Sequence, residues 1–268
     1  MAFSALLRFV TRVFGKAPAE VQPKVVEPSD DTRVVLDAFT ELAPKYEATM
    51  NQELHLLWGV SYGEFIERFI DMVPLDDGAR VLDVATGTAM IPLEVTRRAP
   101  GISHVVGLDI TPAMLAHGQE NVRSADQSSR IRLVCGSGMV LPFGTGTFDV
   151  VTCGLGMHHM HAEQLIQQMR RVLNPGGWLL MADVGAAPAW RSWMGKLAVR
   201  VLLLYFGLTY SRVRIQAEMD AIKNLRTASE WHTFLAEAGF TDITIAEMPG
   251  RRRFYPSGLL IKARAKSL

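Results

Sequence analysis

The stretch ARVLDVATGTAMIPLEV, residues 79–95, joins a strand-like half to a helix-like half. Its first half is a short run of branched apolar residues, and its second half has the apolar spacing of a helix. Small residues, Ala85–Ala89, lie between the halves. Small residues let a ligand approach the backbone, and the start of the following helix offers free N–H groups to an anion. The stretch therefore predicts a ligand site at the end of a strand.

The whole chain has 268 residues and a formal net charge of +1, and 49% of its residues are hydrophobic. Its length allows one large domain or two small ones. The near-neutral charge argues against nucleic-acid binding by bulk electrostatics. Cys135 and Cys153 lie in strand-like runs, so we expect two buried, reduced thiols and a cytoplasmic location. No apolar run reaches the roughly 20 residues of a membrane-spanning helix.

Strand-like and helical segments alternate along most of the chain. Five apolar runs have the composition of strands that are covered on both faces; they are residues 79–85, 104–110, 131–137, 148–154 and 177–184. A later helix begins with a capping-box pattern, Thr227 to Glu230, and stops at Gly239. Two closing strand-like runs, residues 241–248 and 257–265, should pair antiparallel because their connection is short. This order predicts an α/β fold with a doubly wound sheet and a reversed closing strand.

The two ends of the chain differ in character. Residues 1–16, MAFSALLRFVTRVFGK, predict an amphipathic basic helix. Residues 17–31 contain prolines and predict an extended linker, and residues 32–268 predict one domain with a helical insertion at about 188–224. The first helix suits peripheral contact with an anionic membrane, while a helix packed on the domain and a transit-like leader are the alternatives.

Two acids flank the predicted ligand site, which in such sheets lies beyond the carboxyl ends of the strands. Asp83 precedes the small-residue loop, where a carboxylate can meet an ammonium group, and Asp109 ends the next strand, where it can accept both ribose hydroxyls. The loop lacks the G-x-G-x-x-G of a dinucleotide site, which disfavours a nicotinamide oxidoreductase. A nucleoside joined to an amino acid describes S-adenosylmethionine, the predicted cofactor.

The chain resembles the class I methyltransferases over about residues 34–265. The resemblance rests on VLDVATGT, VVGLDITPAML, LPFGTGTFDVV, RRVLNPGGWLLMADV and FLAEAGFTDITI, in family order and spacing. The form DVATGT is most similar to the branch of the ubiquinone and menaquinone C-methyltransferases. The resemblance implies a Rossmann-like sheet of seven strands, in the order 3-2-1-4-5-7-6 with strand 7 antiparallel and helices on both faces. It also implies that the chain is an S-adenosylmethionine-dependent methyltransferase.

Three positions depart from the family pattern. Ala89 stands where the third glycine usually lies, and Ser137 stands where an aspartate often holds the adenine amino group. The run CGLGMHHM lacks the GLRN pattern of the quinone enzymes. The residues expected to contact the cofactor are Asp83, Ala85, Thr86, Gly87, Asp109, Ile110, Gly136, Ser137, Met139 and Gly154. Each has a structural alternative: Asp109 could cap a helix, Ile110 could be core, and Gly154 could serve helix packing.

Two residues are expected to act in catalysis. His158, in the run MHHMH after the fourth strand, is the first candidate for a general base, with an ordinary loop or core histidine as the alternative. Tyr46 matches the tyrosine of the family's APxY motif and is expected to border the methyl donor, on a helix over residues 39–62 that covers the cofactor. Its alternative is packing on the sheet. We expect no metal, because no cysteine or acid lies near the histidines at helical spacing.

The predicted reaction is methyl transfer to a small, lipophilic acceptor. The apolar character of the insertion favours such an acceptor, and C-methylation of a quinone precursor is one candidate. The alternatives are O- or N-methylation of a soluble secondary metabolite and, outside the enzymes, a cofactor-free scaffold that retains the fold.

Overall fold

The computed structural model describes residues 30–186, 211–252 and 255–267. The predicted helix over residues 1–16, nearly all of the linker, and residues 188–210 of the insertion lie outside the described residues. Helix α2 begins at Asp30, two residues before the expected start of the domain. Within the described ranges, no helix is both long and apolar enough to cross a membrane.

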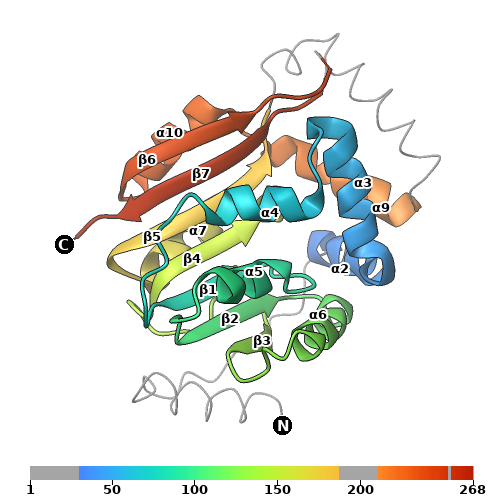
Figure 1. Ribbon diagram of the computed structural model, residues 1–268. Coiled ribbons are helices and arrows are strands. Elements are labelled where there is room, and N and C mark those ends of the chain that lie inside the picture. The colour runs from blue at the N-terminus through green and yellow to red at the C-terminus, as the bar shows by residue number, and fades with distance from the viewer. Residues whose placement is uncertain (1–29, 187–210, 253–254, 268) are drawn as a thin grey trace.

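Seven strands form one sheet in the order β3-β2-β1-β4-β5-β7-β6, as the sequence predicted (Figure 1). The strands are β1 (Arg80–Val84), β2 (His104–Asp109), β3 (Ile131–Cys135), β4 (Phe148–Gly154), β5 (Leu173–Val184), β6 (Phe240–Met248) and β7 (Gly258–Ala265). The first five run parallel, and β7 runs antiparallel to both β5 and β6. The connections change direction between β1 and β4, so ligands are expected beyond the carboxyl ends of these two strands.

Helices cover both faces of the sheet. Strand connections and flanking segments contain the helices α2 (Asp30–Leu42), α3 (Tyr46–Trp58), α4 (Tyr62–Ile70), α5 (Met90–Arg98), α6 (Pro112–Ser124), α7 (Ala162–Val172), α9 (Arg212–Ala221) and α10 (Ala228–Glu237), and the 3₁₀ turns η1 (Ala43–Lys45), η2 (Met157–His159) and η4 (Ile222–Asn224). α4 and α5 pack on one face, and α7 and α10 pack on the other (Figure 1). The capping box of α10 forms between Thr227 and Glu230, as predicted.

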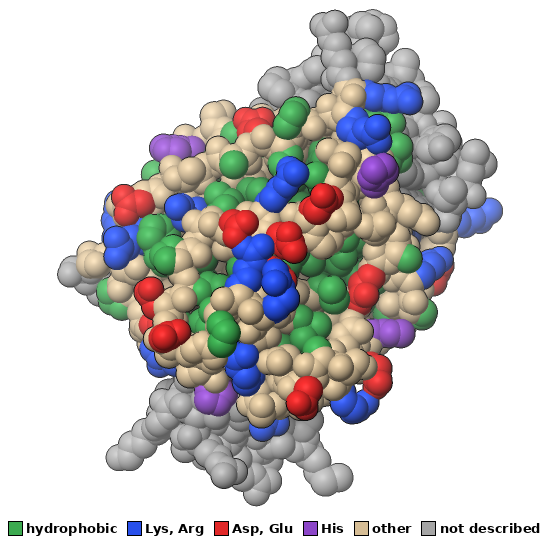
Figure 2. All heavy atoms as spheres, in the orientation of Figure 1, with side chains coloured by type: hydrophobic (Ala, Val, Ile, Leu, Met, Phe, Trp, Pro, Cys, Tyr) green, Lys and Arg blue, Asp and Glu red, His purple; other side chains and the backbone are tan. Residues whose placement is uncertain are grey.

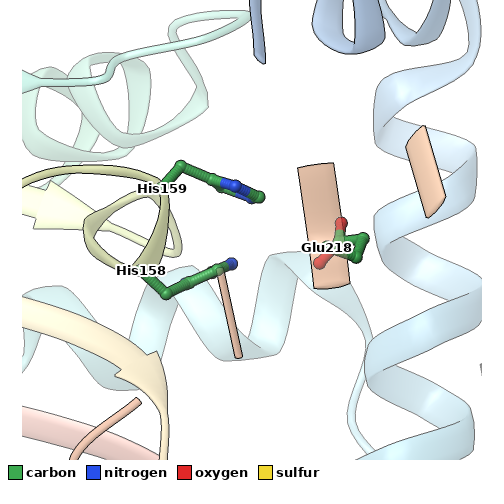
Figure 3. A group of neighbouring side chains, drawn as sticks. All are labelled: His158, His159 and Glu218. Atoms are coloured by element: carbon green, nitrogen blue, oxygen red, sulfur yellow. The ribbon is translucent and has the colours of Figure 1, made fainter. Parts of the chain in front are cut away.

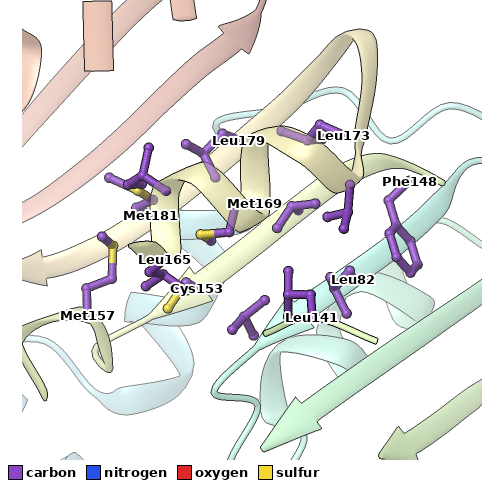
Figure 4. Packing of buried hydrophobic residues seen from close by; sticks show 14 of the residues in the cluster. Leu82, Leu141, Phe148, Cys153, Met157, Leu165, Met169, Leu173, Leu179 and Met181 are labelled. Atoms are coloured by element: carbon purple, nitrogen blue, oxygen red, sulfur yellow. The ribbon is translucent and has the colours of Figure 1, made fainter. Parts of the chain in front are cut away.

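The core under α7 shows why this helix forms where its apolar spacing predicts. Leu165 and Met169 of α7 are fully buried against Cys153 of β4 and Met181 of β5 (Figure 4). Burying a side chain of this size stabilises the fold by about 1.5–3 kcal/mol. The strands that carry the site are therefore held by dense packing below it.

Two local predictions were wrong. The helix expected over residues 39–62 is divided, because Pro44 lacks an N–H and disfavours helical geometry before it, and because Gly59 ends α3 in the left-handed conformation. Both cysteines are free, but only Cys153 is buried; Cys135 is exposed because it ends β3, the edge strand.

Charges of both signs are interspersed on the face shown in Figure 2. Arg97 and Arg98 of α5 pair with Glu94 on the same helix. The described part of this face therefore has no extended basic field of the kind that nucleic-acid binding uses.

Candidate active site

The loop after β1 bends through left-handed backbone at every second residue. Ala85 has φ 57°, Gly87 has φ 54° and Ala89 has φ 65°. Left-handed backbone costs a residue other than glycine roughly 1–2 kcal/mol. Ala85 and Ala89 therefore keep the backbone geometry that glycine would adopt without strain. Gly118 of α6 supports this loop closely, because a Cβ at Gly118 would lie 3.2 Å from the Gly87 carbonyl oxygen.

Asp109, at the end of β2, organises the same loop. One carboxylate oxygen accepts from the Gly87 N–H at 2.8 Å, and the other accepts from the Thr111 N–H at 2.8 Å. Thr111 occupies the N-cap position of α6 without a side-chain capping bond, and its own N–H donates to Asp109, which anchors the residue at which α6 begins. Each oxygen keeps a further lone pair for a ligand hydroxyl. Asp109 therefore positions the loop and the start of α6 and can still accept from ribose hydroxyls.

Asp83 is a buried carboxylate that has no cationic partner among the described residues. Its Oδ1 accepts from the Thr152 hydroxyl at 2.6 Å, whereas its Oδ2 has no hydrogen-bond partner among the described residues. Burial, with the nearby charge of Asp109, raises the pKa of Asp83 to about 7. A buried acceptor without a donor costs about 1–3 kcal/mol, more when it is charged. The position suits a ligand ammonium group, and Thr152 is a supporting residue that the sequence analysis missed.

A cavity of about 290 Å³ opens beside these loops. Its lining includes seven of the residues singled out from the sequence: Ala85, Asp109, Ile110, Gly136, Ser137, Met139 and His158. The Ser137 hydroxyl accepts from the Met139 N–H at 3.2 Å and so shapes the loop that faces the cavity. Ile110 is half-buried and lines the cavity, so it offers an apolar wall.

Other expected contacts lie outside this lining. Asp83, Thr86 and Gly87, at the end of β1 and in the loop after it, are buried and do not belong to the lining of this cavity. Gly154 also lies outside it, and a Cβ there would be 2.6 Å from Ile91 Cδ1. The geometry of Gly154 therefore favours its helix-packing alternative.

Tyr46 begins α3 above the loop. A Cβ at Gly87 would lie 3.9 Å from Cε1 of Tyr46. Tyr62, at the start of α4, packs edge-on against the Tyr46 ring with centroids 6.2 Å apart. Burial raises the pKa of both phenols, with the charge of Asp109 adding to the effect at Tyr46. Both tyrosines are therefore neutral hydroxyls at physiological pH.

His158 lies in η2 and is oriented by an acid from the next strand. Its Nδ1 pairs with Oδ1 of Asp183, a buried residue at the end of β5. Burial lowers the pKa of His158, but the hydrogen bond and charge of Asp183, with the charge of Glu218, raise it, and the net shift is upward. With Nδ1 engaged, Nε2 is the nitrogen left for a substrate proton. A histidine oriented by a carboxylate in this way has the geometry that a general base needs.

Asp183 was missed by the sequence analysis, although a signal was present. It ends an apolar strand just as Asp83 and Asp109 do. The cavity wall near it is closed by Asn224 of η4, which donates from its side chain to the His158 carbonyl at 2.8 Å. Residues from the described part of the insertion thus fix η2 in place.

His159 faces the same region from the next position in η2. Its ring centroid lies 4.3 Å from that of His158, and Phe39 of α2 packs edge-on against it at 5.2 Å. Burial, with His158 beside it, lowers the pKa of His159 well below its usual range. Glu218 of α9 lies opposite both histidines (Figure 3). Arg214 of the same helix pairs with Glu53 of α3 at 2.7 Å and approaches Glu218 at 3.7 Å.

Known proteins share this architecture. The solved structure of the (4+2) cyclase SpnF covers 91% of this chain and 98% of its own, with a TM-score of 0.67 and 18% identity. Geranyl diphosphate C-methyltransferase from Streptomyces coelicolor, solved with Mg²⁺, geranyl diphosphate and S-adenosylhomocysteine, covers 82% of this chain and 84% of its own, with a TM-score of 0.59 and 14% identity. At these identities the likeness shows the fold alone.

The sequence comparisons go further. A Cereibacter sphaeroides (strain ATCC 17029 / ATH 2.4.9) protein named ubiquinone/menaquinone biosynthesis C-methyltransferase UbiE is 31% identical over 169 residues, which is 62% of this chain and 64% of that protein. The aligned part thus spans less than two thirds of that relative. The ubiE/COQ5 methyltransferase family matches residues 26–198, well over half of the chain. The chain therefore belongs to the ubiE/COQ5 methyltransferase family.

Proposed function

We propose that this chain transfers a methyl group from S-adenosylmethionine to a small-molecule acceptor. S-adenosylmethionine is the cofactor, and it supplies an electrophilic methyl group on a sulfonium. The observation that carries the proposal is the buried, unpartnered Oδ2 of Asp83 beside the glycine loop. An amino acid ammonium is the ligand group that completes it, whereas a nicotinamide cofactor has no ammonium to offer there.

The other polar groups fit the remaining parts of the cofactor. Asp109 would accept from the ribose hydroxyls, since both of its oxygens keep a free lone pair. Ile110 and Met139 would contact the adenine ring, and the Ser137 hydroxyl would meet its polar edge. Tyr46 would cover the methyl-donor end, because its ring lies over Gly87. Holding two reactants in line is the main source of acceleration in such a transfer.

His158 would accept the proton that the acceptor loses. Asp183 holds Nδ1, so Nε2 is aligned toward the cavity that His158 lines. A positioned base contributes about 10²–10⁴-fold to a rate. Methylation at carbon on an electron-rich ring needs such a base, because the ring must release a proton after the new bond forms.

We further propose a lipophilic acceptor of the quinol class, methylated at carbon. The printed names of the relatives support this acceptor, and residues 1–16 have the sequence pattern of a helix that would hold a cytoplasmic enzyme at an anionic membrane surface. O- or N-methylation of a soluble metabolite is the second candidate, favoured by the departure of CGLGMHHM from the GLRN pattern.

Calorimetry of the intact chain with S-adenosylmethionine and with NADH tests the cofactor. We expect saturable binding of the first ligand only. Transfer of a labelled methyl group to a short-chain naphthoquinol then tests the acceptor, with a catecholamine and a soluble phenol as comparison acceptors. No binding of S-adenosylmethionine at millimolar concentration would leave the scaffold interpretation standing. Binding with transfer only to the soluble phenol would favour the second candidate.

A further inference from the structure

Three side chains from two distant segments of the chain meet at one point beside the cavity. His158 and His159 come from η2, and Glu218 comes from α9. One ligand atom from each lies within 4.8 Å of the other two (Figure 3). The general-base proposal uses only one of the three. No acid lies near the histidines at helical spacing in the sequence, which predicts no metal, but α9 supplies a carboxylate across the fold.

Both histidines are prepared as ligands. Asp183 holds Nδ1 of His158, which leaves Nε2 as a lone-pair donor, and metal-bound histidines commonly donate their other nitrogen to a carboxylate in this way. Nδ1 of His159 is buried and has no hydrogen-bond partner among the described residues. A buried imidazole nitrogen without a partner is costly, and a cation would satisfy it.

The charges around the cluster also favour a dication. Asp183, Glu218 and Glu53 contribute three negative charges, and Arg214, which pairs with the two glutamates, contributes one positive charge. Histidines must be deprotonated to bind a metal, and in that state this set carries a net charge of two negatives. A divalent ion would neutralise it. Both histidines line the cavity, which provides a path for the ion.

We infer that His158, His159 and Glu218 bind one divalent transition-metal ion of the zinc class. Two imidazoles and one carboxylate are a ligand set that zinc and neighbouring metals prefer, and three protein ligands leave a coordination position open to the cavity. The inference does not rest on the proposed function. The ion and a substrate proton compete for Nε2 of His158, so a bound ion removes the proposed base from use.

The test measures the metal directly, without cofactor or acceptor. The intact, tag-free chain is stripped with a chelator and titrated with Co²⁺, whose visible absorption reports bound nitrogen ligands, and with Zn²⁺ by calorimetry. We expect one ion per chain. Glu218→Gln and His159→Gln should each weaken binding by about tenfold or more, because losing a ligand should cost at least as much as losing a residue that only orients one.

Matched controls distinguish this site from surface histidines. His161→Gln removes the exposed histidine of the same run, and Glu237→Gln removes an exposed acid of α10. Both should keep the affinity within twofold, and circular dichroism should show that all four variants are folded. No Co²⁺ spectrum at 100 µM metal, equal affinity in folded Glu218→Gln, or loss of binding in His161→Gln would overturn the inference.

Discussion

The donor half and the acceptor half of the site satisfy their buried charges differently. The donor half lies at the ends of β1 and β2, where Asp83 and Asp109 form no ion pair among the described residues. The acceptor half lies at the ends of β4 and β5, where His158 pairs with Asp183 and Arg214 pairs with Glu53. We therefore propose that a cationic ligand completes the first half, and that the second half is arranged for proton transfer before a substrate arrives.

The largest effect is expected in the acceptor half. His158→Gln removes the imidazole that would accept the proton, so turnover should fall by about 10²–10⁴-fold. S-adenosylmethionine affinity should stay unchanged, because the donor half does not depend on His158. Single-turnover methyl transfer and calorimetry on the same preparation measure the two quantities. Turnover within twofold of the parent would show that alignment alone suffices, and His161→Gln is the matched control.

A smaller effect is expected in the donor half. Asp109→Ala should weaken S-adenosylmethionine binding by about 2 kcal/mol, roughly 30-fold, because charge-assisted hydrogen bonds are lost. The Gly87 and Thr111 N–H groups also lose their acceptor, so some of the change comes from a looser loop. Glu237→Ala, at an exposed position of α10, is the control. An unchanged dissociation constant in a folded variant would remove Asp109 from the site.

Asp83 makes the donor half sensitive to pH. Its pKa of about 7 means that the carboxylate is protonated below neutrality, so affinity for the ammonium ligand should fall by up to about tenfold per pH unit there. Calorimetry from pH 5.5 to 8.5 measures this slope, and Asp83→Asn should abolish it. An affinity that does not change with pH in the parent chain would show that Asp83 does not bind the ammonium group.

The raised pKa of Asp83 also affects the folding stability of the unliganded protein. Stability should fall as pH rises, whereas affinity for the ligand should increase. The pKa is raised on folding, so above pH 4 the unfolded chain binds fewer protons than the folded one. The contribution of Asp83 to stability is therefore present below about pH 4 and is lost as pH rises through 7. Saturating S-adenosylmethionine should reverse part of this loss, which urea titrations with and without the ligand can measure.

The smallest effect concerns the strained loop. Ala85→Gly should stabilise the fold by about 0.5 kcal/mol, because relief of the left-handed backbone exceeds the added entropy of the unfolded chain. Ala89→Gly should increase the stability of the fold by less, since the fully buried methyl group of Ala89 is lost. Thermal unfolding of the pair measures the difference. A larger increase in stability for Ala89→Gly than for Ala85→Gly would mean that the methyl group of Ala89 is packed too tightly.

Local patterns predicted much of the donor half because its parts are close in sequence. A strand, a small-residue loop and a helix are continuous along the chain, and Asp109 lies at the end of the strand that follows this helix. The residues that hold this loop and its acids in place could not be predicted from local patterns. Thr152 holds Asp83 from β4, and Gly118 allows α6 to approach the loop. These contacts depend on how elements pack, which local periodicity does not encode.

The sequence by itself determined the strand ends that carry Asp83 and Asp109 and the family, because both are written in contiguous residues of characteristic spacing, and the resemblance to that family implied the sheet order. Only the tertiary structure brought Asp183 to His158 and Glu218 to His159. The first pair forms because β4 and β5 are parallel and end at the same edge of the sheet. The second forms because α9 packs across that edge. A side chain's charge state and partner depend on burial and distance, and both arise only when segments far apart in the chain pack together.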